Sequence, residues 1–300
     1  MSILNIIKNR KIKEYQPVSA SHFKSATYHI CYNNKWIECN VFHILYHPVL
    51  ILVSFTDSIN IVHNANIYLK TKHLNGRKDI SMELKLIQNI PLHDQSIWLF
   101  EVINAHLSLN MIEHWYLKRI YNYSQRKGAN FIPNFTFDHY KKIVAMFVNP
   151  KKTYLISIKN DKIYHHFPID LCAEISSYNF IGIRNSNKHA SSLKINEEFY
   201  MSTAACENYE EIYKLGKFSN LNCKEQNNRE QSAMTVLPDI YCAQKKVKLV
   251  DKLILEFQTI YVTKTIETSN FNHSKKPLFH LHKIWYMQLN NLKNIELVQN

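Results

Sequence analysis

The chain has 300 residues, of which 46% are hydrophobic and 20% charged, and it carries a formal net charge of +13 at pH 7. This composition indicates a globular protein with one large core or two ordinary ones, and it excludes a largely disordered chain. The charge alone does not indicate nucleic-acid binding. Of the 37 cations, 31 are Lys and only 6 are Arg, and they are scattered rather than gathered in one basic block.

No membrane segment or leader is expected from the sequence. The most apolar run, Pro48–Phe55, is far shorter than the roughly 20 residues that a bilayer-spanning helix needs, so it predicts a buried strand. The first residues lack the basic-then-apolar order and the small-residue cleavage site of a signal peptide. We therefore expect a cytoplasmic protein with no membrane partner.

Metal and nucleotide motifs are missing from the sequence. The six cysteines form no CxxC pair and the sixteen histidines form no HExxH motif, so reduced structural thiols and no metal are expected. The four glycines, at positions 76, 128, 182 and 216, make a Walker A loop and a GxGxxG motif impossible.

The first 130 residues predict a small α+β domain whose role the sequence does not indicate. The expected strands are Tyr28–Cys31, Trp36–Phe42, Val49–Phe55, Ser81–Ile87 and Ile97–Val102. A helix is expected over Ser108–Gln125, with Met111, Ile112, Trp115 and Tyr116 on a face that we interpret as core. Cations and Gly128 mark its end, and residues 131–134 predict a linker.

The next segment predicts a helix, a hairpin and short mixed elements. Thr136 can cap a helix with apolar positions three to four residues apart, which Pro150 stops. The elements expected after it are a hairpin over 153–158 and 163–167, a strand over Tyr178–Ile183, a helix-like segment over Ser191–Ile195, a strand over Phe199–Ser202, and a helix over Asn208–Leu215 ended by Gly216.

The remainder predicts only strands after a polar loop at 219–231. Lys245–Phe257 and Thr259–Glu267 are long and rich in β-branched and aromatic residues, and Leu278–His280 and Trp285–Leu289 follow. Since no alternation of strands and helices is present, the pattern favours an antiparallel barrel over a parallel sheet.

Five segments in this order resemble the flavin-reductase-like, FMN-binding split-barrel family. They are Asn149–Ser157, Phe167–Leu171, Arg184–Ser191, Val236–Asp239 and Lys276–Tyr286. The resemblance covers about residues 135–290. It implies a mainly β fold, in which a six-stranded antiparallel Greek-key split barrel with short helices follows the smaller N-terminal domain.

The resemblance also implies a cofactor site for FMN. The ring would lie beside the turn formed by Phe167, Pro168, Ile169 and Asp170. The phosphate would lie against a loop that contains Arg184, Asn185, Ser186, Lys188 and Ser191, since a phosphate needs cations, hydroxyls and amides. A solvated surface loop and an Asx-turn cap at Asp170 are the alternative interpretations.

Two positions depart from the family pattern. Asp170 stands where many members have Ser, and Gln258 replaces a His that is associated with the catalytic face. The implied function is electron or hydride transfer between NAD(P)H and flavin. A flavin-binding barrel without turnover, or a nucleic-acid or protein interaction module, are the alternatives. No catalytic residue, nicotinamide preference or electron acceptor is indicated.

The family places the flavin at a subunit interface, so the resemblance further implies a homodimer. Strand residues near Thr259–Thr265 alternate between aromatic and β-branched types and could line the contact between subunits.

Overall fold

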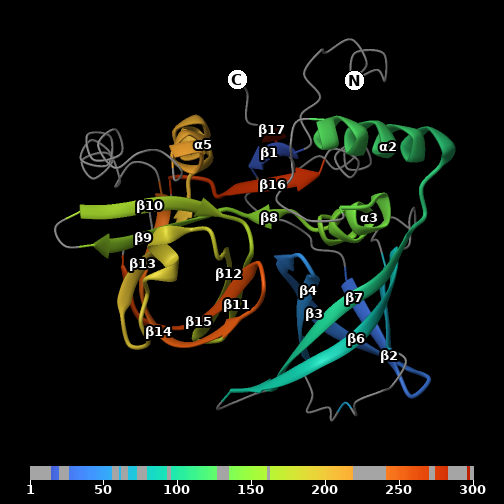
Figure 1. Cartoon of the computed structure of the whole chain (residues 1–300), viewed down its shortest axis with the longest axis horizontal. Helices are drawn as coiled ribbons and strands as arrows, with labels where there is room; N and C mark the ends of the chain where they lie inside the picture. Colours follow the sequence, from blue (N-terminus) through green and yellow to red (C-terminus); the bar gives the residue numbers. More distant parts are fainter. Residues whose placement is uncertain are drawn as a thin grey trace.

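The structure is a computed structural model (Figure 1), and it describes most of the chain. The described residues are 15–19, 27–55, 61, 67–72, 80–92, 96–126, 135–160, 163–218, 241–269, 274–282 and 296–297. Within them the strands form a closed barrel, a seven-stranded sheet and a small four-stranded sheet.

The closed barrel comes first in the chain, and its strand order is β2-β3-β4-β7-β6-β5. Its strands are β2 (Thr27–Tyr32), β3 (Lys35–Tyr46), β4 (Val49–Phe55), β5 (Ile67–Lys72), β6 (Ile80–Pro91) and β7 (Ser96–Leu107). Every neighbouring pair is antiparallel, and pairing of β2 with β5 closes the ring. Inward residues alternate with exposed ones along β5 and β6, as a half-buried strand requires.

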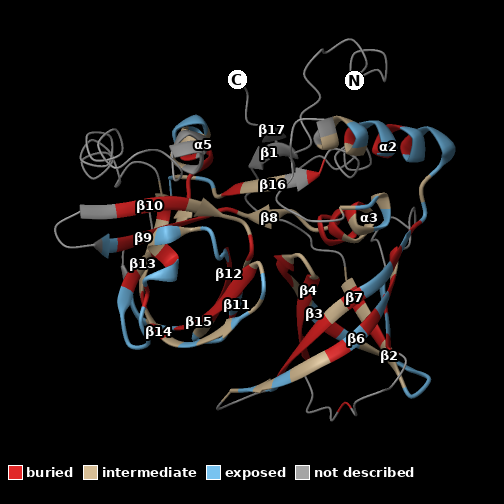
Figure 2. Cartoon of the chain, viewed as in Figure 1, coloured by how far each residue is buried: buried red, intermediate tan, exposed pale blue. Residues whose placement is uncertain are grey.

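The seven-stranded antiparallel sheet has the order β10-β9-β13-β14-β15-β12-β11. Its strands are β9 (Tyr154–Asn160), β10 (Ile163–Ile169), β11 (Cys172–Ile175), β12 (Tyr178–Arg184), β13 (Glu198–Ala204), β14 (Tyr241–Ile254) and β15 (Gln258–Ser269). The edge strands β10 and β11 are consecutive in the chain, and the sheet curls around an apolar interior (Figure 2). The short helix α4 (Lys188–Ser191) contributes Ala190 to that interior.

The four-stranded sheet joins distant parts of the chain. Its order is β17-β1-β16-β8, formed by β17 (Glu296–Leu297), β1 (Tyr15–Ser19), β16 (Leu278–His282) and β8 (Lys151–Lys152). The remaining helices are α2 (Met111–Arg126), α3 (Phe137–Met146), the 3-10 helix η1 (Cys206–Asn208) and α5 (Tyr209–Phe218).

Helix α3 packs on the barrel. The hydroxyl oxygen of Thr136 accepts a hydrogen bond from the backbone N–H of His139, which confirms the predicted cap. Tyr140, Ile143 and Val144 belong to the same apolar core as the barrel strands. A helix that the sequence grouped with the second half therefore packs on the first.

The barrel and the sheet meet along a contact that we call the seam. It is an apolar core of its own, which contains Ile44, Leu45, Leu50, Leu52, Ile97 and Leu99 from the barrel and Ala173, Ile175, Phe180, Ile260 and Val262 from the sheet. Gly182 of β12 makes the close approach possible, because a Cβ atom there would lie 1.8 Å from the carbonyl oxygen of Ile44.

A mainly β protein with a six-stranded antiparallel barrel and short helices is confirmed. The closed barrel lies in residues 27–107, however, where the sequence predicted a smaller α+β domain. The strand that closes it, β5, was not predicted. Strand β15 over Thr259–Thr265 was expected to be exposed for a dimer contact, but Ile260 and Val262 are buried in the seam.

Three smaller expectations also differ. Helix α5 continues past Gly216 to Phe218, and α4 ends at Ser191 rather than beginning there. The predicted strand at 285–289 and the segment at 236–239 lie outside the described residues. None of the described helices is long and apolar enough to cross a membrane.

Candidate functional site

The residues of the predicted ring-binding turn lie in two different environments. Phe167 is buried, and its side chain belongs to the interior core of the curled sheet, against which Ile169 also packs. Pro168 lies opposite Leu155 on the neighbouring strand. Asp170, between β10 and β11, accepts a hydrogen bond from Tyr46 of the barrel. The side chains of Phe167 and Ile169 therefore support the fold, and Asp170 is the ionisable residue of this turn.

Asp170 connects the two halves of the molecule. Its Oδ2 atom accepts a hydrogen bond of 3.0 Å from the hydroxyl of Tyr46, the last residue of β3 in the barrel. The backbone of Tyr46 is held at both ends. Its N–H donates to Gln258 Oε1 at 3.1 Å, and its carbonyl accepts from His139 Nε2 at 2.7 Å. These two hydrogen bonds fix the backbone of Tyr46, and the Tyr46 hydroxyl positions the Asp170 carboxylate.

Lys151 and His280 complete the polar group at this end of the seam. They lie directly opposite each other on β8 and β16, and the Asp170 charge acts on both. Burial lowers the pKa of the Lys151 ammonium from 10.5 to about 7, and Asp170 opposes that shift. Burial also lowers the pKa of His280, again against Asp170. We call Tyr46, Lys151, Asp170, Gln258 and His280 the seam cluster.

Aromatic rings enclose one side of the seam cluster. The Tyr46 and Phe147 rings are stacked with centroids 6.3 Å apart, and Lys151 Nζ lies 5.7 Å from the centroid of Phe147. His43 packs edge-on against Tyr46 at 4.9 Å and donates from Nε2 to the carbonyl of Leu45, while its buried Nδ1 has no hydrogen-bond partner. Burial, with the Lys151 charge second, lowers the pKa of His43, so its ring stays neutral.

The predicted phosphate loop follows β12 and presents cations to solvent. Arg184, Ser186 and Lys188 are exposed. Arg184 is the residue opposite Gln258 in the pairing of β12 with β15. Paired residues point to the same side of a sheet, and Gln258 hydrogen-bonds to Tyr46, so Arg184 lies on the side of the sheet that faces Tyr46.

Two other residues of this loop, Asn185 and Ser191, form hydrogen bonds within the protein. The Asn185 amide donates to the carbonyls of Leu255 at 2.7 Å and Glu256 at 3.1 Å, and its oxygen accepts from the hydroxyl of Thr259 at 2.7 Å. Ser191 donates to the carbonyl of Lys188 at 3.0 Å. The side chains of Asn185 and Ser191 therefore stabilise the conformation of the loop.

A phosphate at this loop would contact side chains, because two backbone amides of the following helix already have partners. The second and third N–H groups of α4, from His189 and Ala190, already donate to the side-chain oxygen of Asn187. A phosphate would instead meet Arg184 and Lys188 with the hydroxyl of Ser186, which together supply charge and a hydrogen-bond donor.

Two histidines of β10, His165 and His166, contact different neighbours. His165 and His189 stack with centroids 3.8 Å apart, and His166 Nδ1 is 2.7 Å from the hydroxyl of Ser157. Burial lowers the pKa of His166 to about 4. Within the described ranges no group of three or more His, Cys, Asp or Glu could hold a metal ion.

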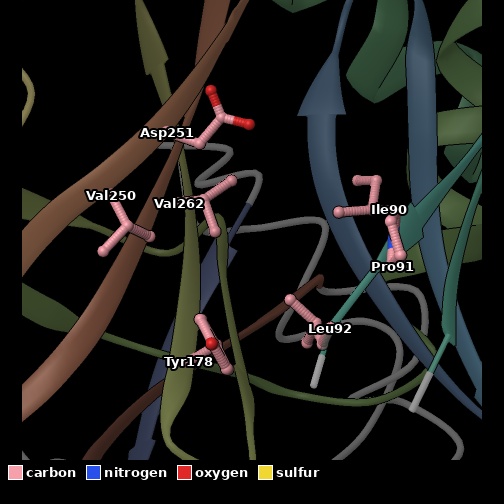
Figure 3. A pocket seen from close by; sticks show the side chains of 7 residues that line it. All are labelled: Ile90, Pro91, Leu92, Tyr178, Val250, Asp251 and Val262. Carbon is pink, nitrogen blue, oxygen red and sulfur yellow. The ribbon is translucent and has the colours of Figure 1, made fainter. Parts of the chain in front are cut away.

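A cleft of about 480 Å³ opens at the other end of the seam (Figure 3). Its walls are Ile90 and Pro91 at the end of β6, Leu92 directly after it, and Tyr178, Val250, Asp251 and Val262 from the sheet. A β-bulge between Leu249 and Asp251 brings the consecutive residues Val250 and Asp251 to the same cleft. Tyr178 and Arg184 are six residues apart on β12, so about 20 Å separate this cleft from the phosphate loop.

Sequence reasoning identified Asp170, Arg184 and Gln258 but missed Tyr46, Lys151 and His280. Tyr46 is 124 residues from Asp170 in the chain. It lies in the half to which the sequence assigned no site, and no local pattern marks it. The Lys151 segment was recognised only as the start of a hairpin, because burial of its ammonium depends on packing that a strand pattern does not reveal.

No protein-family model and no curated protein matches this sequence. Among solved structures, the FMN-binding protein from Thermus thermophilus matches 43% of this chain and 81% of its own, at 10% identity and a TM-score of 0.36. BorF, the flavin reductase component of a bacterial tryptophan halogenase, matches 48% and 99%, at 10% identity and 0.38. The NADH:FAD oxidoreductase SgcE6 from Streptomyces globisporus matches 48% and 89%, at 7% identity and 0.36. Over less than half of its length, this chain is similar to flavin reductases and FMN-binding split-barrel proteins.

Proposed function

We propose that this chain binds FMN at the end of the seam where the seam cluster meets the phosphate loop. The observation that carries the proposal is the position of Arg184. Arg184 is exposed and lies opposite Gln258 on the neighbouring strand. The Gln258 side chain hydrogen-bonds to the backbone of Tyr46, and the Tyr46 hydroxyl hydrogen-bonds to Asp170. These contacts link a cationic loop to an oriented carboxylate.

In this proposal the two ends of the cofactor meet different chemistry. Arg184 and Lys188, together with the Ser186 hydroxyl, bind the phosphate through charge-assisted hydrogen bonds. Tyr46 occupies Oδ2 of Asp170, which leaves Oδ1 to accept from a ribityl hydroxyl or a ring N–H. Bound flavin would supply hydride and electron chemistry, while the chain orients it. Transfer between NAD(P)H and flavin is the activity we propose first, in a cytoplasmic protein.

Binding without turnover is the second candidate, and Gln258 favours it. Its side chain is buried and its oxygen accepts from the backbone N–H of Tyr46 at 3.1 Å. The residue at this family-associated catalytic position therefore ties the barrel to the sheet. Adding NAD(P)H and FMN to the protein separates the candidates, because only a reductase consumes the nicotinamide.

The binding proposal is tested by the visible spectrum of the purified protein and by fluorescence titration with FMN. Arg184→Ala should weaken FMN binding tenfold or more, since a charge-assisted pair contributes about 1.5–3 kcal/mol. Lys194→Ala removes an exposed cation beyond the loop and is the matched control. Equal affinity of wild type and Arg184→Ala would exclude this phosphate site.

The role of Asp170 is tested by the same titration. Asp170→Ser should weaken binding, because the carboxylate faces Tyr46, Lys151 and His280 rather than the cationic loop. Tighter binding by Asp170→Ser would instead place the phosphate beside the carboxylate. At 5 Å the repulsion would be about 3 kcal/mol for an effective dielectric constant near 20.

A further inference from the structure

Helix α2 has one face in the barrel core and an apolar patch on the opposite face. Tyr116, Leu117 and Ile120 are buried in the core that the barrel and α3 share. Met111 is 84% exposed, Ile112 52% and Trp115 50%. The sequence placed Met111, Ile112 and Trp115 on a core face, so the structure corrects that prediction. We call these three residues the α2 patch.

The α2 patch is held rigidly by the start of its helix. The side-chain oxygen of Asn110 accepts from the backbone N–H of Glu113, and the Glu113 carboxylate accepts from the backbone N–H of Asn110, both at 2.9 Å. This reciprocal capping box fixes the first turn. Met111 and Ile112 therefore project outward from an ordered turn, and their exposure does not come from a frayed helix end.

Cations follow the α2 patch along the same side of the helix. The exposed positions with described side chains are Met111, Ile112, His114, Trp115, Lys118, Arg119 and Asn122, and none of them is acidic. The guanidinium of Arg119 lies 4.9 Å from the centroid of the Trp115 ring. Glu113, the acidic residue of the first turn, is buried in the capping box. This side of α2 is therefore apolar at its start and positive beyond.

We propose that this side of α2 docks on the surface of an anionic lipid bilayer. Apolar side chains with a Trp would enter the interface, and Lys118 and Arg119 would meet lipid phosphates, as in helices that lie on membranes. The net charge of +13 attracts the whole molecule to such a surface. The same charge opposes docking of a second copy, which would bring together two cationic faces. The proposal does not depend on flavin binding.

Co-sedimentation with large vesicles tests the proposal directly. The full chain should pellet with vesicles of phosphatidylcholine and phosphatidylserine and remain in solution with phosphatidylcholine alone. Raising the salt concentration should weaken the binding, since exposed charges are screened. The double variant Met111→Ser, Ile112→Ser and the double variant Lys118→Glu, Arg119→Glu should each lower the bound fraction at least tenfold.

A matched control removes exposed apolar residues elsewhere. Ile254 and Ile266 are 66% and 49% exposed on the sheet, and Ile254→Ser with Ile266→Ser should bind as wild type does. Circular dichroism melting curves confirm that each variant is folded. Binding equal on neutral and anionic vesicles, or unchanged in both α2 variants, would overturn the proposal. So would wild-type self-association that the Met111→Ser, Ile112→Ser variant abolishes, because the α2 patch would then be a contact between copies.

Discussion

At the scale of single residues, Gly182 decides whether the barrel and the sheet can meet. A Cβ atom at this position would lie 1.8 Å from the Ile44 carbonyl oxygen and 3.0 Å from a methyl group of Leu45. The first contact is with backbone and cannot be relieved by a rotamer change. Gly182→Ala should therefore separate the strands locally and lower the free energy of unfolding by about 1–3 kcal/mol or more.

Urea denaturation checks this prediction through the unfolding midpoint. Ser186→Thr adds a methyl group at an exposed position of the loop that follows β12 and is the control. Adding Leu45→Ala to Gly182→Ala should not restore stability, because it removes only the side-chain contact. A Gly182→Ala midpoint equal to that of wild type would show that β3 and β12 are not packed this closely.

The Tyr46–Asp170 hydrogen bond is the second prediction at this scale. Tyr46→Phe and Asp170→Asn each remove or weaken a partly buried bond, and each should cost about 0.5–1.5 kcal/mol. Because the two groups act on each other, the double variant should cost less than the sum of the single variants. Strict additivity in urea denaturation would mean that the two side chains are not in contact in solution.

At the scale of elements, local sequence patterns predicted strands and helices well. The Val49–Phe55 strand and the Thr136 cap are confirmed as predicted. Segments without a strong pattern were missed. The two-residue β8 exists only because β16 pairs with it, and β5 exposes Tyr68 and Lys70 on one face. Helix α5 continues through Gly216 to Phe218. The low helix propensity of a single glycine is outweighed by the helical residues around it.

Contact between α3 and β16 predicts how stability depends on pH. His282 is fully buried, its Nε2 lies 2.9 Å from the Tyr140 hydroxyl, and burial lowers its pKa to about 3. In the unfolded chain the ring takes up a proton near pH 6.5, but in the folded chain it stays neutral down to about pH 3. The contribution of His282 is therefore complete above pH 6.5 and is lost as the pH falls towards 3, by about 1.4 kcal/mol per pH unit.

Urea midpoints at several pH values between about 7 and 5 measure this slope. His282→Gln keeps a hydrogen-bonding group without a titrating ring, so its stability should fall less steeply with acid than that of wild type. His106→Gln, at an exposed position of the barrel, is the control. Equal slopes for wild type and His282→Gln would mean that His282 is accessible to protons in the folded state.

At the scale of the whole molecule, sequence reasoning recognised an antiparallel barrel but could not decide which strands close. Closure depends on pairing Thr27–Tyr32 with Ile67–Lys72, and the seam depends on Gly182 facing Ile44. These contacts join segments that are far apart in sequence. The seam cluster shares this origin, since its members come from the barrel, β8, β16 and the sheet. A single sequence contains no local signal for such pairings.

The seam also changes what is expected of self-association. The sequence assigned a homodimer contact to Thr259–Thr265, but within the chain the barrel already covers Ile260 and Val262 there. An apolar face that is buried inside one chain cannot also bind a second copy unless the barrel is displaced. We therefore predict that Ile260 and Val262 take part in no dimer contact, and size-exclusion chromatography with light scattering at micromolar concentration measures whether the 35.6-kDa chain associates through another surface.

Two substitutions on β15 test this last prediction. Ile260→Glu places a charge in the seam and should destabilise the chain by several kcal/mol, because a buried unpaired carboxylate is costly. Ile266→Glu changes a residue that is 49% exposed and should leave both mass and stability unchanged. A wild-type mass of twice 35.6 kDa that Ile266→Glu returns to 35.6 kDa would restore a dimer contact on β15, beyond the part that the barrel covers.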